Sequence, residues 1–141
     1  MKVRFSLCLI ALGLTAQLAG QTNSGDVHIS LKEAVPVFEH CGHIEEDANA
    51  QQTCFNRFIM NHIMNELQWP EGLDENGLVF VEVVFDAMGK ITQVESVRSY
   101  DDRAAEEAVR ALQSLPDAVE PAKVQGVPSA YSCAVPVSFE R

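Results

Sequence analysis

The sequence predicts an α+β fold in which two helices pack on one face of a three-stranded antiparallel sheet. Apolar residues recur at helical spacing after Cys54, and the β-branched and aromatic run from Leu78 to Phe85 is the strongest strand signal in the chain. The predicted order of helix, strand, strand, helix and strand is typical of helices that cover one face of a small antiparallel sheet. With 141 residues, of which 47% are hydrophobic and 21% charged, the chain suits a single packed domain.

The first helix is predicted from the spacing of its apolar residues. It must end before Pro70, which also restricts the backbone of Trp69. The polar segment 45–52 before it is expected to be a loop or a frayed turn. Further upstream, alternation over residues 27–31 suggests a brief strand, and residues 35–38 are expected to be extended. The apolar positions of the helix are Phe55, Phe58, Ile59, Ile63 and Leu67.

A β-hairpin is predicted next. The strand from Leu78 to Phe85 is followed by Asp86–Gly89, where a glycine can take the positive φ that a hairpin loop needs. The second strand spans 91–98. Its apolar residues do not keep a period of two, so we expect a bulge or a twisted end.

The second helix is predicted from Ser99–Asp102, which resembles a capping box, up to the stop at Leu115-Pro116. A loop with Pro121, Gly126 and Pro128 follows. The residues expected to face the core are Ala104, Ala105, Ala108, Val109 and Leu112.

The last strand is predicted to span Ser129 to Phe139 and to lie at a sheet edge. Its odd-numbered residues are mostly large and apolar and its even-numbered residues are small, so one face should be buried and the other wettable. Pro136 cannot donate a hydrogen bond to a neighbouring strand, which favours an edge position. If Pro136 faces the open edge, Ala130, Ser132 and Ala134 offer backbone groups there to an incoming extended peptide. Two alternatives stay open, namely an edge that Pro136 protects and a homodimer in which two such strands pair.

The first twenty residues, 1–20, have the features of a secretory signal peptide. Two positive charges precede an apolar run from Phe5 to Ala19, and small residues follow at Ala19 and Gly20. Cleavage before Gln21 would leave 121 residues with a net charge of −12, and residues 21–34 would form a short flexible leader. We therefore expect the protein to be exported, with an uncleaved membrane anchor as the alternative.

The charge and the motifs argue against several functions. The net charge of −10 disfavours nucleic acid as a partner, because phosphate backbones would be repelled. There is no Gly-x-Ser-x-Gly elbow, and no serine has a pattern-matched base. We expect neither an enzyme nor a cofactor.

The cysteines after the signal segment allow a disulfide or a metal site. Cys41 and Cys54 are close in sequence, and a bond between them in an exported protein should stabilise the fold by about 3 kcal/mol. Cys133 would then remain as a buried thiol. Zinc is the less favoured alternative, because the Cys41-Gly-His43 spacing is tighter than usual. The candidate ligands would be His40, Cys41, His43, Cys54 and His62.

An ordered set of segments resembles the C-terminal domain of TonB energy transducers. The resemblance covers roughly residues 35–139, and the front part with Val35–Phe38, Cys41 and Cys54 looks like the variant of Bacteroidetes-type members. The matching segments are Trp69-Pro70, Gly77–Phe85, Asp86–Val94, Leu115–Ala122, Gly126–Pro128 and Val135–Phe139.

This resemblance implies a periplasmic domain, here residues 35–141, whose last strand captures the TonB box of an outer-membrane receptor by strand addition. Carried over by position, Trp69-Pro70 would match an aromatic-proline element near the receptor-facing end. The capture edge would comprise Ser129, Ala130, Tyr131, Ser132, Cys133, Ala134 and Val135.

The chain also departs from a full transducer. Such a protein has a transmembrane helix that engages a proton-driven motor, followed by a long proline-rich spacer. Here the leader 21–34 would reach only about 50 Å when extended, and we expect that to be too short to cross a periplasm. An adaptor that binds another cell-envelope protein, without direct energy transduction, is therefore an alternative.

Overall fold

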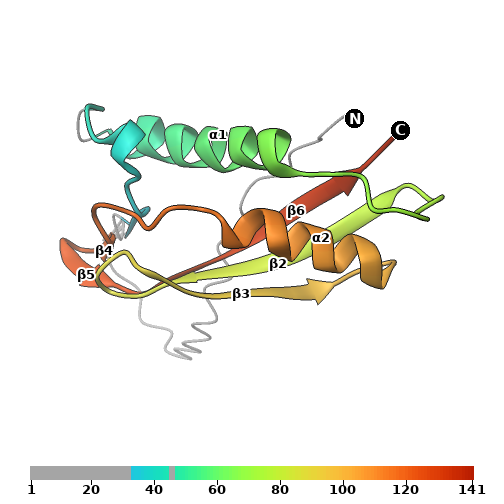
Figure 1. Ribbon diagram of the computed structural model, residues 1–141. Coiled ribbons are helices and arrows are strands. Elements are labelled where there is room, and N and C mark those ends of the chain that lie inside the picture. The colour runs from blue at the N-terminus through green and yellow to red at the C-terminus, as the bar shows by residue number, and fades with distance from the viewer. Residues whose placement is uncertain (1–32, 45–46) are drawn as a thin grey trace, which may run out of the picture.

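A computed structural model describes residues 33–44 and 47–141 (Figure 1). The strand expected over 27–31 and the signal segment lie outside the described residues. In chain order the elements are β1 (Glu33–Ala34), the short 3-10 helix η1 (Glu39–Cys41), α1 (Ala48–Glu66), β2 (Gly77–Phe85), β3 (Ile91–Arg98), α2 (Asp102–Gln113), β4 (Ala122–Val124), β5 (Val127–Ser129) and β6 (Tyr131–Phe139).

The main sheet has the order β3-β2-β6 and is antiparallel throughout, and α1 and α2 cover one of its faces (Figure 1). The predicted fold class is therefore confirmed. β2 is the central strand because, after α2, the chain returns to the side of β2 opposite β3 and forms β6 there. The core lies between the helices and the sheet, and the inward residues Val79, Val81, Val83 and Phe85 of β2 have no exposed surface.

The β2–β3 hairpin turns where the sequence predicts. Gly89 has a φ of +87°, and the Asp86 carboxylate accepts hydrogen bonds from the backbone N–H groups of Met88 and Lys90. A Cβ at Gly89 would also lie 2.9 Å from the carbonyl oxygen of Ala118, so glycine is needed for its conformation and for its close contact. Two register shifts interrupt the β2–β3 ladder, which confirms the expected bulge.

Helix α1 begins earlier than predicted. The Asp47 side chain accepts a hydrogen bond from the N–H of Asn49 and caps the helix, which then starts at Ala48. The expectation of a loop or frayed turn is therefore wrong for residues 48–52. The helix ends at Glu66, before Pro70, and buries Phe55, Ile59 and Ile63 as predicted.

Helix α2 starts near the predicted position but uses a different cap. Asp101, rather than Ser99, accepts hydrogen bonds from the N–H groups of Arg103 and Ala104. The Ser99 hydroxyl instead donates to the Asp101 carbonyl oxygen. The buried face is also rotated slightly from the predicted one, and it consists of Ala104, Ala108, Ala111 and Leu112.

A second small sheet, with the order β1-β4-β5, ties the front of the domain to the segment before β6. The sequence predicted only a loop over β4 and β5. Val37 pairs with Glu120 in an isolated bridge, and Phe38 behind it is fully buried. The Phe38 ring stacks on Phe55 and Phe58, with ring centroids 5.4 Å and 4.3 Å away. The front segment is therefore part of the hydrophobic core.

A disulfide joins Cys41 and Cys54, as predicted, with Cα atoms 6.0 Å apart. It fixes η1 to the second turn of α1. We expect the double variant Cys41→Ser with Cys54→Ser to lose about 3 kcal/mol of unfolding free energy, because the cross-link no longer restricts the unfolded chain. Urea denaturation of the double variant and of the unaltered protein measures this loss. Equal free energies of unfolding would contradict the expectation.

Two charged side chains of α2 also form hydrogen bonds with backbone groups at the end of α1. The Glu107 carboxylate accepts hydrogen bonds from the N–H of Gln68 and from Arg110, which also donates to the Glu66 carbonyl oxygen. Partial burial raises the pKa of Glu107, but the hydrogen bonds from Arg110 and from the N–H of Gln68 together lower it by more. The pKa therefore lies below its ordinary value of 4.5.

This depressed pKa predicts an acid-sensitive contribution to stability. A carboxyl group whose pKa is lower in the folded protein stabilises the fold above its unfolded pKa, and the contribution is lost as the pH falls through the folded pKa. We expect the free energy of unfolding to fall between about pH 5 and about pH 3, and less steeply in Glu107→Gln. Urea denaturation across that range measures both slopes. Identical slopes would show that Glu107 contributes nothing.

Candidate functional site

Strand β6 forms one edge of the main sheet. It pairs with β2 in a regular register of nine residue pairs, from Gly77 with Phe139 to Phe85 with Tyr131. Within residues 33–44 and 47–141 no strand pairs with its other side. The edge position predicted from Pro136 is confirmed. The predicted start of the strand is wrong, because Ser129 belongs to β5 and Ala130 lies between the two strands.

The register shows which backbone groups of β6 point away from β2. Pro136 stands opposite Phe80 within an unbroken ladder, and it has no N–H to donate. Backbone groups of successive residues point to opposite sides of a strand, so the even-numbered residues of β6 face the outer side. The hydrogen bonds of the β2–β3 hairpin lead to the same assignment. The N–H of Asp86 donates to the Lys90 carbonyl oxygen on the β3 side, so the backbone groups of its neighbour Phe85 point towards β6.

On the sheet face that points away from the helices, the first half of β6 is more accessible than the second half. Ser132 is exposed and its hydroxyl donates to the Glu82 carboxylate at 3.0 Å, while Ala134 is half-buried. Pro136 and Ser138, in contrast, are buried. The expectation that this sheet face is small and wettable is therefore correct at Ser132. It is wrong towards the end of the strand, where Pro136 and Ser138 stand opposite Phe80 and Leu78.

The inner face of β6 is buried along its whole length, as predicted. Tyr131 and Cys133 retain 9% and 1% of their surface, and Val135, Val137 and Phe139 retain 2% or less. Cys133 is not a free thiol, so that part of the expectation is wrong. The core residues hold the strand in place while its outer backbone groups remain on the edge.

The opposite edge of the sheet, β3, is protected. The N–H of Ile91 donates to the Asp117 carboxylate at 2.8 Å, which closes the start of that edge. Two register shifts distort β3, and it carries the exposed charges of Glu95 and Arg98. Bulges and charges are the usual means of preventing edge-to-edge pairing. β6 has neither between Tyr131 and Phe139, so of the two edges it is the one suited to accept another strand.

Trp69 and Pro70 lie at the other end of β6. The Trp69 ring packs edge-on against Phe139, with centroids 6.1 Å apart, and its Nε1–H donates to the Leu73 carbonyl oxygen. The Arg141 guanidinium lies 4.4 Å from the centre of the same ring. The strand between Tyr131 and Phe139 is about 27 Å long. The structure therefore does not bring Trp69 together with the predicted capture segment.

The zinc alternative finds no support in the described residues. Cys41 and Cys54 are bonded to each other, and His62 Nε2 lies 3.0 Å from the Ala111 carbonyl oxygen and 2.8 Å from the Ser114 hydroxyl. No group of three or more histidine, cysteine or acidic side chains is arranged to hold a metal within these residues. Of the helices in the described ranges, none is long and apolar enough to span a bilayer.

Comparison with known proteins gives one match. Residues 71–140 match the family model described as Gram-negative bacterial TonB protein C-terminal. The matched region contains β2, β3, α2 and β4 to β6, whereas η1 and α1 precede it. No curated protein and no solved structure matches the chain.

Proposed function

Residues 71–140 belong to the TonB C-terminal family, and on that premise we propose that this protein is a periplasmic module that binds the TonB box of outer-membrane receptors by β-strand addition. Membership of this family supports a role in TonB-dependent transport. The finer proposal concerns its partner, a short extended segment of a receptor, and the place where that segment binds.

The difference between the two sheet edges carries this proposal. β6 offers the N–H groups of Ser132 and Ala134 on its outer side, whereas β3 is bulged, charged and closed by Asp117. An incoming strand would add main-chain hydrogen bonds to this edge, and alternate side chains of the peptide would supply specificity. The proposed docking segment is Ser129 to Val135, in which Tyr131 to Val135 provide the regular strand.

Export is part of the proposal. We infer that residues 1–20 direct the chain to the periplasm, that 21–34 form a leader, and that 35–141 are the functional domain. The buried Phe38 supports a domain that begins before the family match, because its ring packs on α1 and β2.

A second function uses the same edge. The absence of charge along β6 suits pairing of two copies as well as capture of a peptide, which would give a self-associating or adaptor domain without direct energy transduction. Analytical ultracentrifugation separates these functions. Self-association requires a concentration-dependent sedimentation coefficient in the absence of peptide, whereas peptide capture does not.

The test of strand addition is amide hydrogen exchange with a synthetic TonB-box peptide from a receptor of the same genome. We expect the amides of Ser132 and Ala134 to become protected, because they would donate to the peptide. The amides of β3 serve as the internal control and should be unchanged. Binding without protection at Ser132 and Ala134, or no binding at all, would refute the proposed site.

A further inference from the structure

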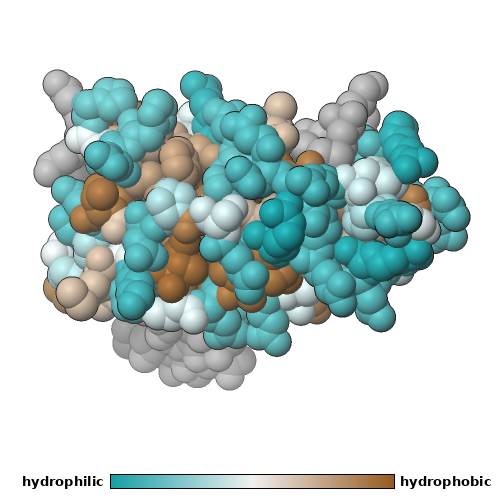
Figure 2. Space-filling view, in the orientation of Figure 1, coloured by the Kyte–Doolittle hydropathy of each residue, from teal (hydrophilic) through white to brown (hydrophobic). Residues whose placement is uncertain are grey.

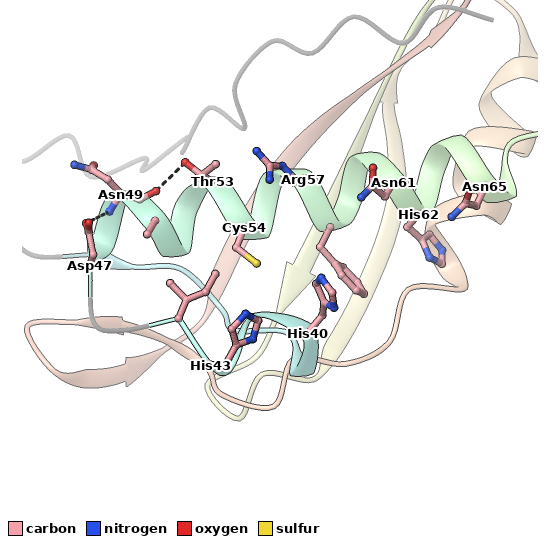
Figure 3. A pocket seen from close by; sticks show the side chains of 13 residues that line it. His40, His43, Asp47, Asn49, Thr53, Cys54, Arg57, Asn61, His62 and Asn65 are labelled. Carbon is pink, nitrogen blue, oxygen red and sulfur yellow. Dashed lines mark hydrogen bonds between the residues drawn. The ribbon is translucent and has the colours of Figure 1, made fainter.

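Helix α1 has two flanks of different chemistry. On one side it faces η1 across a groove of about 760 Å³ (Figure 3). Arg57, Asn61 and His62 are among the residues that line this groove. Figure 2 shows that polar side chains also cover much of the surface over the two helices. The described residues that line the groove do not include Met60 or Met64, which lie on another side of the helix.

Contacts with the sheet show which strand α1 follows. Near the start of the helix, the Phe55 ring packs on Tyr131 at the start of β6, with centroids 5.7 Å apart. Just after the helix, Trp69 packs on Phe139 at the end of β6, with centroids 6.1 Å apart. Figure 1 shows α1 and β6 running in the same general direction. α1 therefore extends along β6, whereas α2 contacts β2 and β3.

Met60 and Met64 lie on the flank of α1 that is turned away from α2. His62 marks the α2 side, because its Nε2 lies 3.0 Å from the Ala111 carbonyl oxygen. Each residue advances by about 100° around a helix, so both methionines lie about 160° from His62. The order of the sheet is β3-β2-β6, and α2 contacts its first two strands. The methionine flank therefore lies above the outer edge of β6.

The rise of the two elements places the methionines beside the proposed docking segment. Met60 and Met64 lie about 7.5 Å and about 13.5 Å along the helix axis from the ring contact at the start of both elements. In a strand these lengths correspond to about two and about four residues. The two side chains therefore lie beside Cys133 and Val135, in the half of β6 where we propose that a receptor segment binds.

The methionine flank consists of uncharged side chains. Met64 is 56% exposed and Met60 is half-buried. The residues one and two turns before Met60 are Asn56 and Gln52, and the Gln52 side-chain amide donates to Asn56 Oδ1 at 3.1 Å. Methionine is flexible and polarizable, so it adapts to apolar side chains of different shapes. An exposed methionine beside a strand edge is therefore suited to contact an apolar side chain of an added strand.

A strand added to β6 would direct every second side chain towards this flank. Successive side chains of a strand point to opposite faces, and residues that pair directly point to the same face. Peptide residues that pair with the inward-facing Cys133 and Val135 would thus point towards α1. We propose that the β6 edge and Met60 and Met64 form one binding surface, which selects an extended segment with bulky apolar side chains at two alternate positions. This inference rests on the proposed strand addition and specifies which ligand side chains α1 recognises.

The experiment combines Met60→Gln with Met64→Gln and measures affinity for the synthetic TonB-box peptide by calorimetry. Glutamine has nearly the length of methionine, but its amide would lose hydrogen bonds to water against an apolar side chain. We expect the affinity to fall at least about fivefold. At saturating peptide the amides of Ser132 and Ala134 should still become protected from exchange, because the backbone of β6 is unchanged.

Two altered peptides identify the side chains that meet the methionines. One has serine at every odd-numbered position of the peptide, and the other has serine at every even-numbered position. We expect one of them to bind the unaltered protein at least about fivefold more weakly than the original peptide does. That same peptide should bind the double variant and the unaltered protein equally, because the contact has already been removed from one partner.

Met88→Gln is the matched control, since Met88 is 82% exposed but lies in the β2–β3 turn. It should keep the affinity within about twofold. Full affinity in the double variant, with Ser132 and Ala134 protected, would overturn the role of α1 and leave strand addition standing. Absence of protection at both amides in the unaltered protein would refute strand addition and this inference with it.

Met64→Gln alone provides a second variant, because circular dichroism must show that each altered protein is folded. Met64 is largely exposed, so this change should leave the fold intact even if the change at the half-buried Met60 does not. We expect the single variant to lose at least about twofold in affinity. An unchanged affinity in the folded single variant would overturn the proposed contact at Met64.

Discussion

Replacement of Phe38 by alanine is expected to lower the free energy of unfolding by about 3–5 kcal/mol, the usual cost of removing a buried phenylalanine ring. Phe38 has no exposed surface, and its ring contacts Phe55 and Phe58 of α1 and Phe85 of β2. The substitution would leave a cavity at the point where the front segment, helix and sheet meet. Urea or thermal denaturation followed by circular dichroism measures the change.

Met88→Ala provides the control for this variant. Met88 is 82% exposed in the β2–β3 turn, so its truncation should change stability by less than about 0.5 kcal/mol. A similarly small effect of Phe38→Ala would show that the front segment is dispensable. The expected large effect would instead support a domain that begins near residue 35, well before the family match at residues 71–140.

The main sheet was predictable because its signals are local. The apolar run of β2, the turn at Asp86–Gly89 and the proline in β6 each restrict the backbone within a few residues. Pro136 was especially informative, because a missing N–H has only a few acceptable positions in a sheet. Together they predicted the sheet and the edge position of β6.

The features that sequence did not predict depend on contacts between distant segments. β4 and β5 have three residues each, too few for a periodic pattern. β4 is held by pairing with β1, and β5 by pairing with β4 across the turn at Gln125-Gly126, where both residues have positive φ. The polar start of α1 forms because Asp47 caps it and the disulfide fixes its second turn. Polar composition alone therefore gave the wrong state for residues 48–52.

The candidate sites were predictable to different degrees. Alternation along β6 identified the buried inner face, but it could not show that Pro136 and Ser138 on the outer face are also buried. The histidines near Cys41 suggested metal ligands, whereas the structure places His40 and His43 on the wall of a groove opposite α1.

Substitution of Ser132 by proline is expected to abolish binding of the TonB-box peptide, with a loss of affinity of at least about tenfold. The N–H of Ser132 faces the outer side of β6, so proline removes a donor from the docking edge and places its ring against the incoming strand. The ladder with β2 does not use this N–H, and Tyr131 before it is already extended, as a residue that precedes proline must be. Peptide affinity is measured by calorimetry and folding by circular dichroism.

Ser132→Ala separates the backbone effect from the loss of the side chain. Both variants lose the hydrogen bond from the Ser132 hydroxyl to Glu82, which should cost each of them about 1 kcal/mol of stability. Only the proline variant also loses the N–H. If a peptide pairs with β6, the alanine variant should keep nearly the full affinity while the proline variant loses it. Equal affinities in two folded variants would mean that the peptide does not pair with β6 at this residue, and strand addition at Ser132 would have to be abandoned.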